Sequence, residues 1–340
     1  MKTNNFFPFT FVLQYAGNVS YFSLYFMIYN KTSNKFLNTH KGIQPIRVLQ
    51  EWIPSKFENT YSGFLNLVEQ IIQQYNLDPG INYHIENDIV KTPYVDTIKR
   101  IHIQETFLSY VWCVSYTLMT IYNEALPYNV KSNDLIDDKK ILATLNLFDY
   151  GLSLIKFYTP WDKENLPNPE LYAQTEELSI EIANQVFIYA LNYILCHEFA
   201  HVEMNHADKR RQEGYRNDYV LQTEIEADKR ALELMQKGIT DNTKEIISIS
   251  IVVGLCCLLY FKHTTISNKG THPDTDNRIH NVLEQMDPES SSPIWGIAYI
   301  AYRLWDYKFL KMYLWSNDTS SNKELYYNLY NQIQNEKKGA

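Results

Sequence analysis

The segment HEFAH, residues 197–201, places two histidines four residues apart, with a glutamate directly after the first of them. On a helix, residues at this spacing lie within about 40° of each other, so His197 and His201 share one face. Two imidazole nitrogens on one face can bind a single metal ion. Glu198 lies about 60° from His201, where a carboxylate can take a proton from a water molecule that the metal activates.

A hydrolytic zinc site uses three protein ligands and keeps one position open for water, so a third ligand has to come from elsewhere in the chain. The segment TEIEADKRA, residues 223–231, begins far enough after His201 for a turn and a second helix that crosses the first. Within it, Glu224 and Asp228 share a helix face, and Glu226 points elsewhere. We predict that Glu224 is the third ligand and that Asp228 accepts the N–H of a ligating histidine. The alternative is a solvent-exposed acidic face.

His206 is a further histidine close to the motif, but the spacing does not predict it as a ligand. It follows His197 by nine residues, and on a continuous helix it would point about 180° away from it. The longer motif HExxHxxGxxH, whose glycine bends the chain, is absent. We therefore expect His206 at the surface or at a helix end.

Long helices are predicted around these residues. Residues 175–204 lead into the motif without glycine or proline, residues 217–238 form an amphipathic pattern that ends at a glycine, and residues 105–126 are apolar on most faces. Short apolar runs in residues 1–60 favour strands or hairpins, and KRIHIQ at 99–104 favours a brief strand.

These patterns predict a mainly α-helical fold, with an α+β fold as the alternative if a small N-terminal β element forms. We expect a zincin-like helical core in which the HEFAH helix is crossed by the helix that carries EIEAD, residues 224–228. The chain divides into residues 1–100, an N-terminal region of uncertain fold, and residues 101–340, a helical domain built around the predicted zinc site.

Composition and charge exclude some classes of function. The chain has 340 residues, of which 45% are hydrophobic, and this is enough for a sizeable core. Lysine and arginine number 31 against 39 aspartates and glutamates, which gives a formal net charge of −8. Because the sequence also contains no basic run of five or more residues, no nucleic-acid partner is expected. The four cysteines show no CxxC spacing, and we interpret them as free thiols in a reducing cytosol.

One apolar stretch, residues 246–261, raises the question of a membrane span. It has 16 residues, whereas a bilayer span needs about 20, and two serines and a glycine make it less apolar. We predict a buried core helix, with a membrane span as the alternative. The N-terminal residues contain Asn and Pro where a secretory leader needs a continuous apolar core. A cytoplasmic protein without stable membrane insertion is therefore expected.

HEFAH followed by EIEADKRAL resembles the gluzincins, zinc peptidases whose third ligand is the first glutamate of an ExxAD-type segment. THPDTDNRIHNVL, residues 271–283, is similar to the HP-then-R element of membrane peptidases of the Ste24 and HtpX type and of their soluble relatives. Trp161 and the connection LPNP also precede the motif helix. Taken together, residues 100–285 most resemble the Lit-like phage-exclusion peptidases, the U49 family.

This resemblance implies a cytoplasmic bacterial endopeptidase used in abortive phage defence, with translation elongation factor Tu as the protein substrate associated with the family. It agrees with the roles predicted from the residues themselves. In that prediction His197, His201 and Glu224 hold Zn²⁺, and Glu198 is the general base that also returns the proton to the leaving amine.

The predicted reaction needs a second group that stabilises the oxyanion of the attacked carbonyl. His272 and Arg278 of the HP-then-R element are the candidates, and His263 is a weaker one. For His272 the alternative is that the HP pair simply forms a turn.

Two other classes of function stay open. One is a binding protein in which zinc ties two helices together and no substrate is cut. Structural zinc sites usually fill four positions and favour cysteine, but Cys196 projects about 100° away from His197, and Glu198 would have no purpose there. The other class is a membrane-embedded peptidase of the Ste24 and HtpX type.

Overall fold

The computed structural model describes residues 42–77, 81–125, 138–214, 216–261, 273–314 and 319–339. Most of the predicted N-terminal strands fall on residues 1–41, outside the described residues. Where the prediction can be compared, it is wrong: residues 42–60 form the 3₁₀-helix η1 (Pro45–Leu49) and helix α3 (Trp52–Glu58). These short segments bury Ile46, Leu49, Ile53 and Phe57 at helical spacing, whereas the apolar runs on which the strand prediction was based lie in the residues before 42.

The remaining helices span most of the described chain. They are α4 (Phe64–Tyr75), α5 (Glu105–Ala125), α7 (Asp138–Ser153), η2 (Gln174–Glu176), α8 (Glu177–Glu203), α9 (His206–Glu213), α10 (Asn217–Lys237), α11 (Lys244–Leu259), α12 (Thr275–Met286), α13 (Pro293–Phe309) and α14 (Asn322–Gly339). The prediction of a mainly α-helical fold is therefore confirmed.

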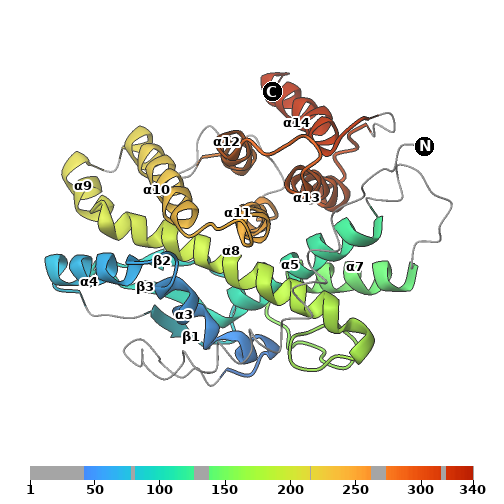
Figure 1. The fold of residues 1–340 in the computed structure, drawn as a ribbon, viewed down its shortest axis with the longest axis horizontal. Coiled ribbons are helices and arrows are strands. Elements are labelled where there is room, and N and C mark those ends of the chain that lie inside the picture. Colours follow the sequence, from blue (N-terminus) through green and yellow to red (C-terminus); the bar gives the residue numbers. More distant parts are fainter. Residues whose placement is uncertain are drawn as a thin grey trace.

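Helix α8 crosses the middle of the molecule and is the element around which the others pack (Figure 1). Its sequence contains neither glycine nor proline, and apolar residues lie on most of its faces, so it is stable only when it is covered on nearly all sides. Helices α3, α5, α10 and α11 supply that cover. The HEFAH motif occupies the last two turns of this buried helix.

Helix α11 contains the apolar stretch that raised the membrane question. Nearly all of its side chains are buried inside the protein, mainly against α8, α12 and α13. Among the described residues, one segment, Gln174–Glu203, is long and apolar enough to cross a membrane, and 67% of its apolar window is buried in the fold. The core helix of a folded protein has the same properties, so this finding carries no further conclusion.

A small sheet lies beside the end of α8. Strand β3 (Ile101–Gln104) is its centre, paired in parallel with β1 (Ile81–His84) and antiparallel with the two-residue strand β2 (Tyr94–Val95). The brief strand predicted at residues 99–104 is thus confirmed. Strand β2 contacts α8, and residues of β2 and of the segment before it line the cavity described below.

Candidate metal centre

The two histidines of the motif point to a common position beside α8. Both lie in the last turns of the helix, and His197 is only 7% exposed. Their Nε2 atoms are 3.2 Å apart. The predicted sharing of one helix face is therefore what the structure shows, and it places two imidazole nitrogens where one ion can reach both.

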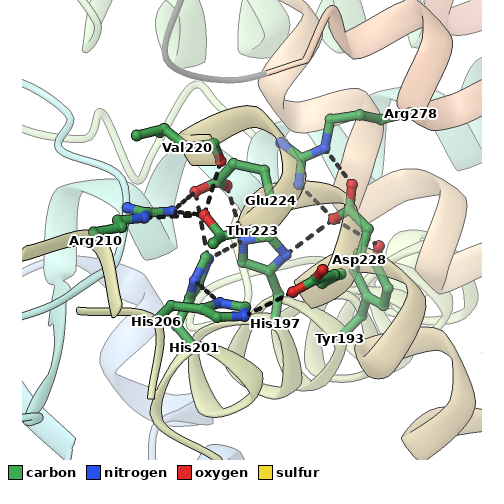
Figure 2. A network of polar contacts seen from close by, with 11 residues as sticks. Tyr193, His197, His201, His206, Arg210, Val220, Thr223, Glu224, Asp228 and Arg278 are labelled. Atoms are coloured by element: carbon green, nitrogen blue, oxygen red, sulfur yellow. Dashed lines mark hydrogen bonds and ion pairs between the residues drawn. The ribbon is translucent and has the colours of Figure 1, made fainter. Parts of the chain in front are cut away.

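Glu224 comes to these histidines from α10, which packs along α8 (Figure 2). One of its carboxylate oxygens, Oε2, lies 3.4 Å from His197 Nε2, and the other, Oε1, lies 3.5 Å from His201 Nε2. A tetrahedral zinc ion with bonds of about 2.05 Å separates its ligand atoms by about 3.3 Å. The distance between the two rings, and the distance from each ring to the nearer oxygen of Glu224, are close to that value. One ligand atom from each of the three residues lies within 4.8 Å of the other two, so the group can hold a metal ion.

Arg210, on α9, contacts the same glutamate from the other side. Its Nη2 donates to Glu224 Oε1 over 2.7 Å, and its Nε donates to Thr223 Oγ1 over 2.9 Å. Glu224 is 3% exposed, and a buried carboxylate needs a compensating charge. Arg210 provides part of that charge and fixes the carboxylate. Arg210 was not predicted from the sequence, because a contact between two helices joined by a turn leaves no periodic signal.

Asp228 lies one turn after Glu224 on α10 and holds the other nitrogen of His197. Its Oδ1 is 2.9 Å from His197 Nδ1, and Tyr193 donates to the same oxygen over 3.3 Å. Arg278, from α12, donates its Nε to Oδ2 over 2.7 Å and its Nη2 to Oδ1 over 2.6 Å. A carboxylate that accepts the Nδ1–H of a ligand fixes the tautomer in which Nε2 is free to bind metal.

These contacts set the protonation of the pair. Burial alone would raise the pKa of Asp228, but the charge of Arg278 and the hydrogen bonds of His197 and Arg278 hold it well below its usual range. Burial also disfavours a charged imidazole, yet hydrogen bonds with Asp228 and Glu224 outweigh it and raise the pKa of His197 to about 9. Burial lowers the pKa of His201. Without a metal, the proton of this site therefore resides on His197.

Glu198 lies on the wall of a cavity of about 440 Å³ that also reaches His197, His201 and Glu224. Burial, with the neighbouring charge of Glu224 adding to it, raises the pKa of Glu198 to about 7. A carboxyl group poised near neutrality can both accept and return a proton during one reaction cycle. The role of Glu198 as general base stays a prediction, and its place on the cavity wall and its raised pKa are compatible with it.

Residues 101–298 match the sequence profile of the family described as Peptidase U49. The chain belongs to the peptidase U49 family. It is similar to the "Cell death peptidase" of Escherichia coli strain K12, with 23% identity over 228 residues that cover 63% of this chain and 70% of that protein. No solved structure matches it. Family and relative together make this U49 chain a peptidase, and the resemblance stated from its motifs is confirmed.

The other predicted residues of this U49 peptidase have different outcomes. His272 and His263, two of the candidates for the oxyanion donor, lie outside the described residues. Arg278 is described, and the contacts of its guanidinium are to Asp228. Glu226 points away from Glu224, as expected from the helix period, and its side chain is 43% exposed. The boundary placed between residues 100 and 101 stays a prediction.

His206 corrects the sequence analysis. His206 is the first residue of α9, so the prediction that it lies at a helix end is confirmed. However, it is only 1% exposed and does not lie at the surface. The assumption of a continuous helix was wrong, because α8 ends at Glu203 and Asn205 adopts a left-handed conformation with φ 56°. The chain turns there, and the His206 ring returns to within 4.9 Å of the His201 ring.

Proposed function

We propose that this U49 peptidase is a zinc-dependent endopeptidase. One observation carries the proposal: two histidines and a glutamate from two helices bring their ligand atoms within 4.8 Å of one another, and Glu198 lines the same cavity. Zinc is the metal whose proteins most often use this donor set with one position left open. A structural zinc site would favour a fourth protein ligand, and the described residues place no fourth histidine, cysteine, aspartate or glutamate in the group.

In the proposed mechanism His197, His201 and Glu224 hold the ion. When bound, the zinc ion supplies Lewis-acid polarisation of the peptide carbonyl and of the attacking water. Glu198 accepts the proton of that water and then gives it to the amine that leaves, which keeps the proton count balanced. Asp228 and Arg278 keep the Nε2 lone pair of His197 directed at the ion throughout.

The residues that line the cavity include two kinds of surface that a peptide can contact. Tyr94 and Val95 of the edge strand β2 line one wall, and an edge strand can pair with a peptide backbone through its open side. Apolar side chains of α5, α8 and α11, among them Phe107, Ile194 and Leu255, line another. A peptide side chain could be buried there while the metal end of the cavity stays polar.

For the substrate we propose a cytosolic protein of the bacterial host, and we place the enzyme itself in the cytoplasm. The resemblance to phage-exclusion peptidases makes translation elongation factor Tu the first candidate substrate and abortive phage defence the biological setting. The name of the Escherichia coli relative, a cell death peptidase, agrees with an enzyme whose activity harms its own cell.

The decisive experiment compares wild type with Glu198→Gln in a bacterial host, with new protein termini detected across the proteome. Glutamine has the shape of glutamate but cannot accept the proton, so we expect the variant to keep its metal while peptide cleavage is lost. Glu233→Gln is the matched control, because Glu233 is an exposed glutamate on α10. Cleavage at the wild-type rate by Glu198→Gln would contradict the proposed mechanism. Purified protein that binds no zinc would contradict the proposed zinc dependence.

A metal-stabilised binding protein is the rival function. It predicts that zinc is bound, that the protein is stabilised, and that no new termini appear with either wild type or Glu198→Gln. Zinc removal by a chelator distinguishes the two further: the proposed peptidase loses cleavage and regains it when zinc is added back.

A further inference from the structure

The two imidazoles of the motif are held by different partners. The Nδ1 of His197 meets the carboxylate of Asp228. The Nδ1 of His201 instead lies 2.8 Å from Nδ1 of His206, a residue five positions later that would point about 140° away on a continuous helix. The turn at Asn205 brings His206 into this place, and the ring is buried there at 1% exposure.

The placement of protons in this contact follows from the metal site. If Nε2 of His201 is a ligand, its proton has to be on Nδ1, so Nδ1 of His206 has to accept. The proton of His206 then resides on Nε2, and that atom lies 3.3 Å from Oε2 of Glu226. The result is a contact between two neutral rings, with the carboxylate of Glu226 the nearby group toward which the buried Nε2 of His206 can donate.

A neutral histidine has an electrostatic advantage at this position. Glu198, Glu224 and Asp228 already place three carboxyl groups within the buried site. A fourth carboxylate directly against His201 would add another buried negative charge, which is costly. His206 can accept the hydrogen bond without adding charge, and the nearby carboxylate of Glu226, 3.3 Å from its Nε2, is on a side chain that is 43% exposed.

We propose that His206, supported by Glu226, is a positioning residue that fixes the ring orientation and the tautomer of His201 for metal binding. This inference rests on the proposed function, because it requires that His201 binds the metal through Nε2. It assigns a role to a histidine that the spacing of the motif alone would leave aside.

The test is metal affinity, measured with Co²⁺ as the probe in competition with a chelator. His206→Asn keeps an acceptor oxygen close to the place of Nδ1, whereas His206→Gln places its amide nearer to Nε2, and His206→Ala has no acceptor. We expect the alanine and glutamine variants to bind Co²⁺ about 10–100-fold more weakly than wild type, and the asparagine variant to stay within about threefold of it. The visible spectrum of bound Co²⁺ should change only in the first two.

His280→Ala is the matched control, since His280 stacks on Tyr330 away from the site and its loss should leave Co²⁺ affinity unchanged. Circular dichroism of the metal-free proteins separates a folding defect from a binding defect. Should the His206 variants fail to fold, Glu226→Ala provides the test on an exposed residue, with Glu233→Ala as its control on the same helix. Glu226→Ala should bind Co²⁺ severalfold more weakly than Glu233→Ala.

The outcomes separate this inference from the proposed function. The role of His206 would be overturned if folded His206→Ala bound Co²⁺ with wild-type affinity, or if the asparagine and glutamine variants lost equal affinity. If the His206 variants do not fold, wild-type Co²⁺ affinity in Glu226→Ala would overturn it. The zinc peptidase proposal would then still stand. Wild-type protein that binds neither Co²⁺ nor Zn²⁺ would overturn the proposed function itself, and this inference with it.

Discussion

Arg278 donates two hydrogen bonds to Asp228, which lies 50 residues earlier in the sequence. Its Nε is 2.7 Å from Oδ2 and its Nη2 is 2.6 Å from Oδ1. Both residues are 8% exposed. Because Asp228 also holds His197, the pair connects α12 to the motif on α8 through α10. The HP-then-R element of the sequence thus contributes its arginine to the support of His197 through Asp228.

Removing one partner of this pair should be costly for stability. Asp228→Asn leaves the Arg278 charge buried without compensation, and we expect a loss of about 3–5 kcal/mol in the free energy of unfolding of the metal-free protein. Metal affinity should fall by about 10–100-fold as well, because His197 loses its orienting carboxylate. Urea denaturation and Co²⁺ titration measure the two effects.

The double variant Asp228→Asn/Arg278→Met is the control for this pair, since it removes both charges. It should be clearly more stable than the sum of the two single losses predicts. Strict additivity would mean that the two side chains do not interact in solution as they do in the structure.

Metal binding should release a proton from His197. The pKa of this residue is raised to about 9 in the metal-free chain, so the ring is protonated at pH 8 and the ion has to displace that proton. Apparent affinity should rise by about tenfold per pH unit until pH 9 and then level off. Calorimetry in two buffers of different ionisation enthalpy counts the protons.

The same pKa has a consequence for stability. Since the folded-state pKa lies above the unfolded value of 6.5, protonated His197 stabilises the metal-free protein fully below that value, and this contribution is lost as the pH rises from 6.5 to about 9.

Asp228→Asn removes the main cause of the raised pKa of His197, so this variant should release fewer protons than wild type when it binds metal at pH 8. An equal proton count in both proteins would contradict the assignment.

Gly254 allows α11 to lie close against α8. A Cβ atom at this position would be 3.2 Å from the carbonyl oxygen of Ala190 and 3.4 Å from Cδ1 of Tyr193, the residue that donates to Asp228. We expect Gly254→Val to cost about 1–3 kcal/mol in unfolding free energy through overpacking, and Gly254→Ala less, because better helix propensity offsets part of the strain.

Gly339→Ala on α14 is the matched control for this prediction. A Cβ at Gly339 meets no atom within 4 Å, so alanine there should be neutral or slightly stabilising. Thermal unfolding of the three variants measures the difference. A Gly254→Val protein as stable as wild type would show that the two helices can separate without loss.

The sequence by itself determined the parts of this protein that depend on local periodicity. The 3.6-residue repeat puts His197 and His201 on one face, and the same repeat pairs Glu224 with Asp228 while it turns Glu226 away. Continuous apolar patterning likewise indicates that α8 and α11 are buried helices. These features need no knowledge of how the helices pack.

Only the tertiary structure decided which side chains support the site from a distance. Arg278 reaches Asp228, and Arg210 reaches Glu224, through helix packing that leaves no regular spacing in the chain. His206 depends on a single backbone turn at Asn205, which breaks the helix period that sequence reasoning extends. The physical reason is the same in each case: periodicity describes one helix, whereas these contacts are made where separate helices meet and compensate buried charge.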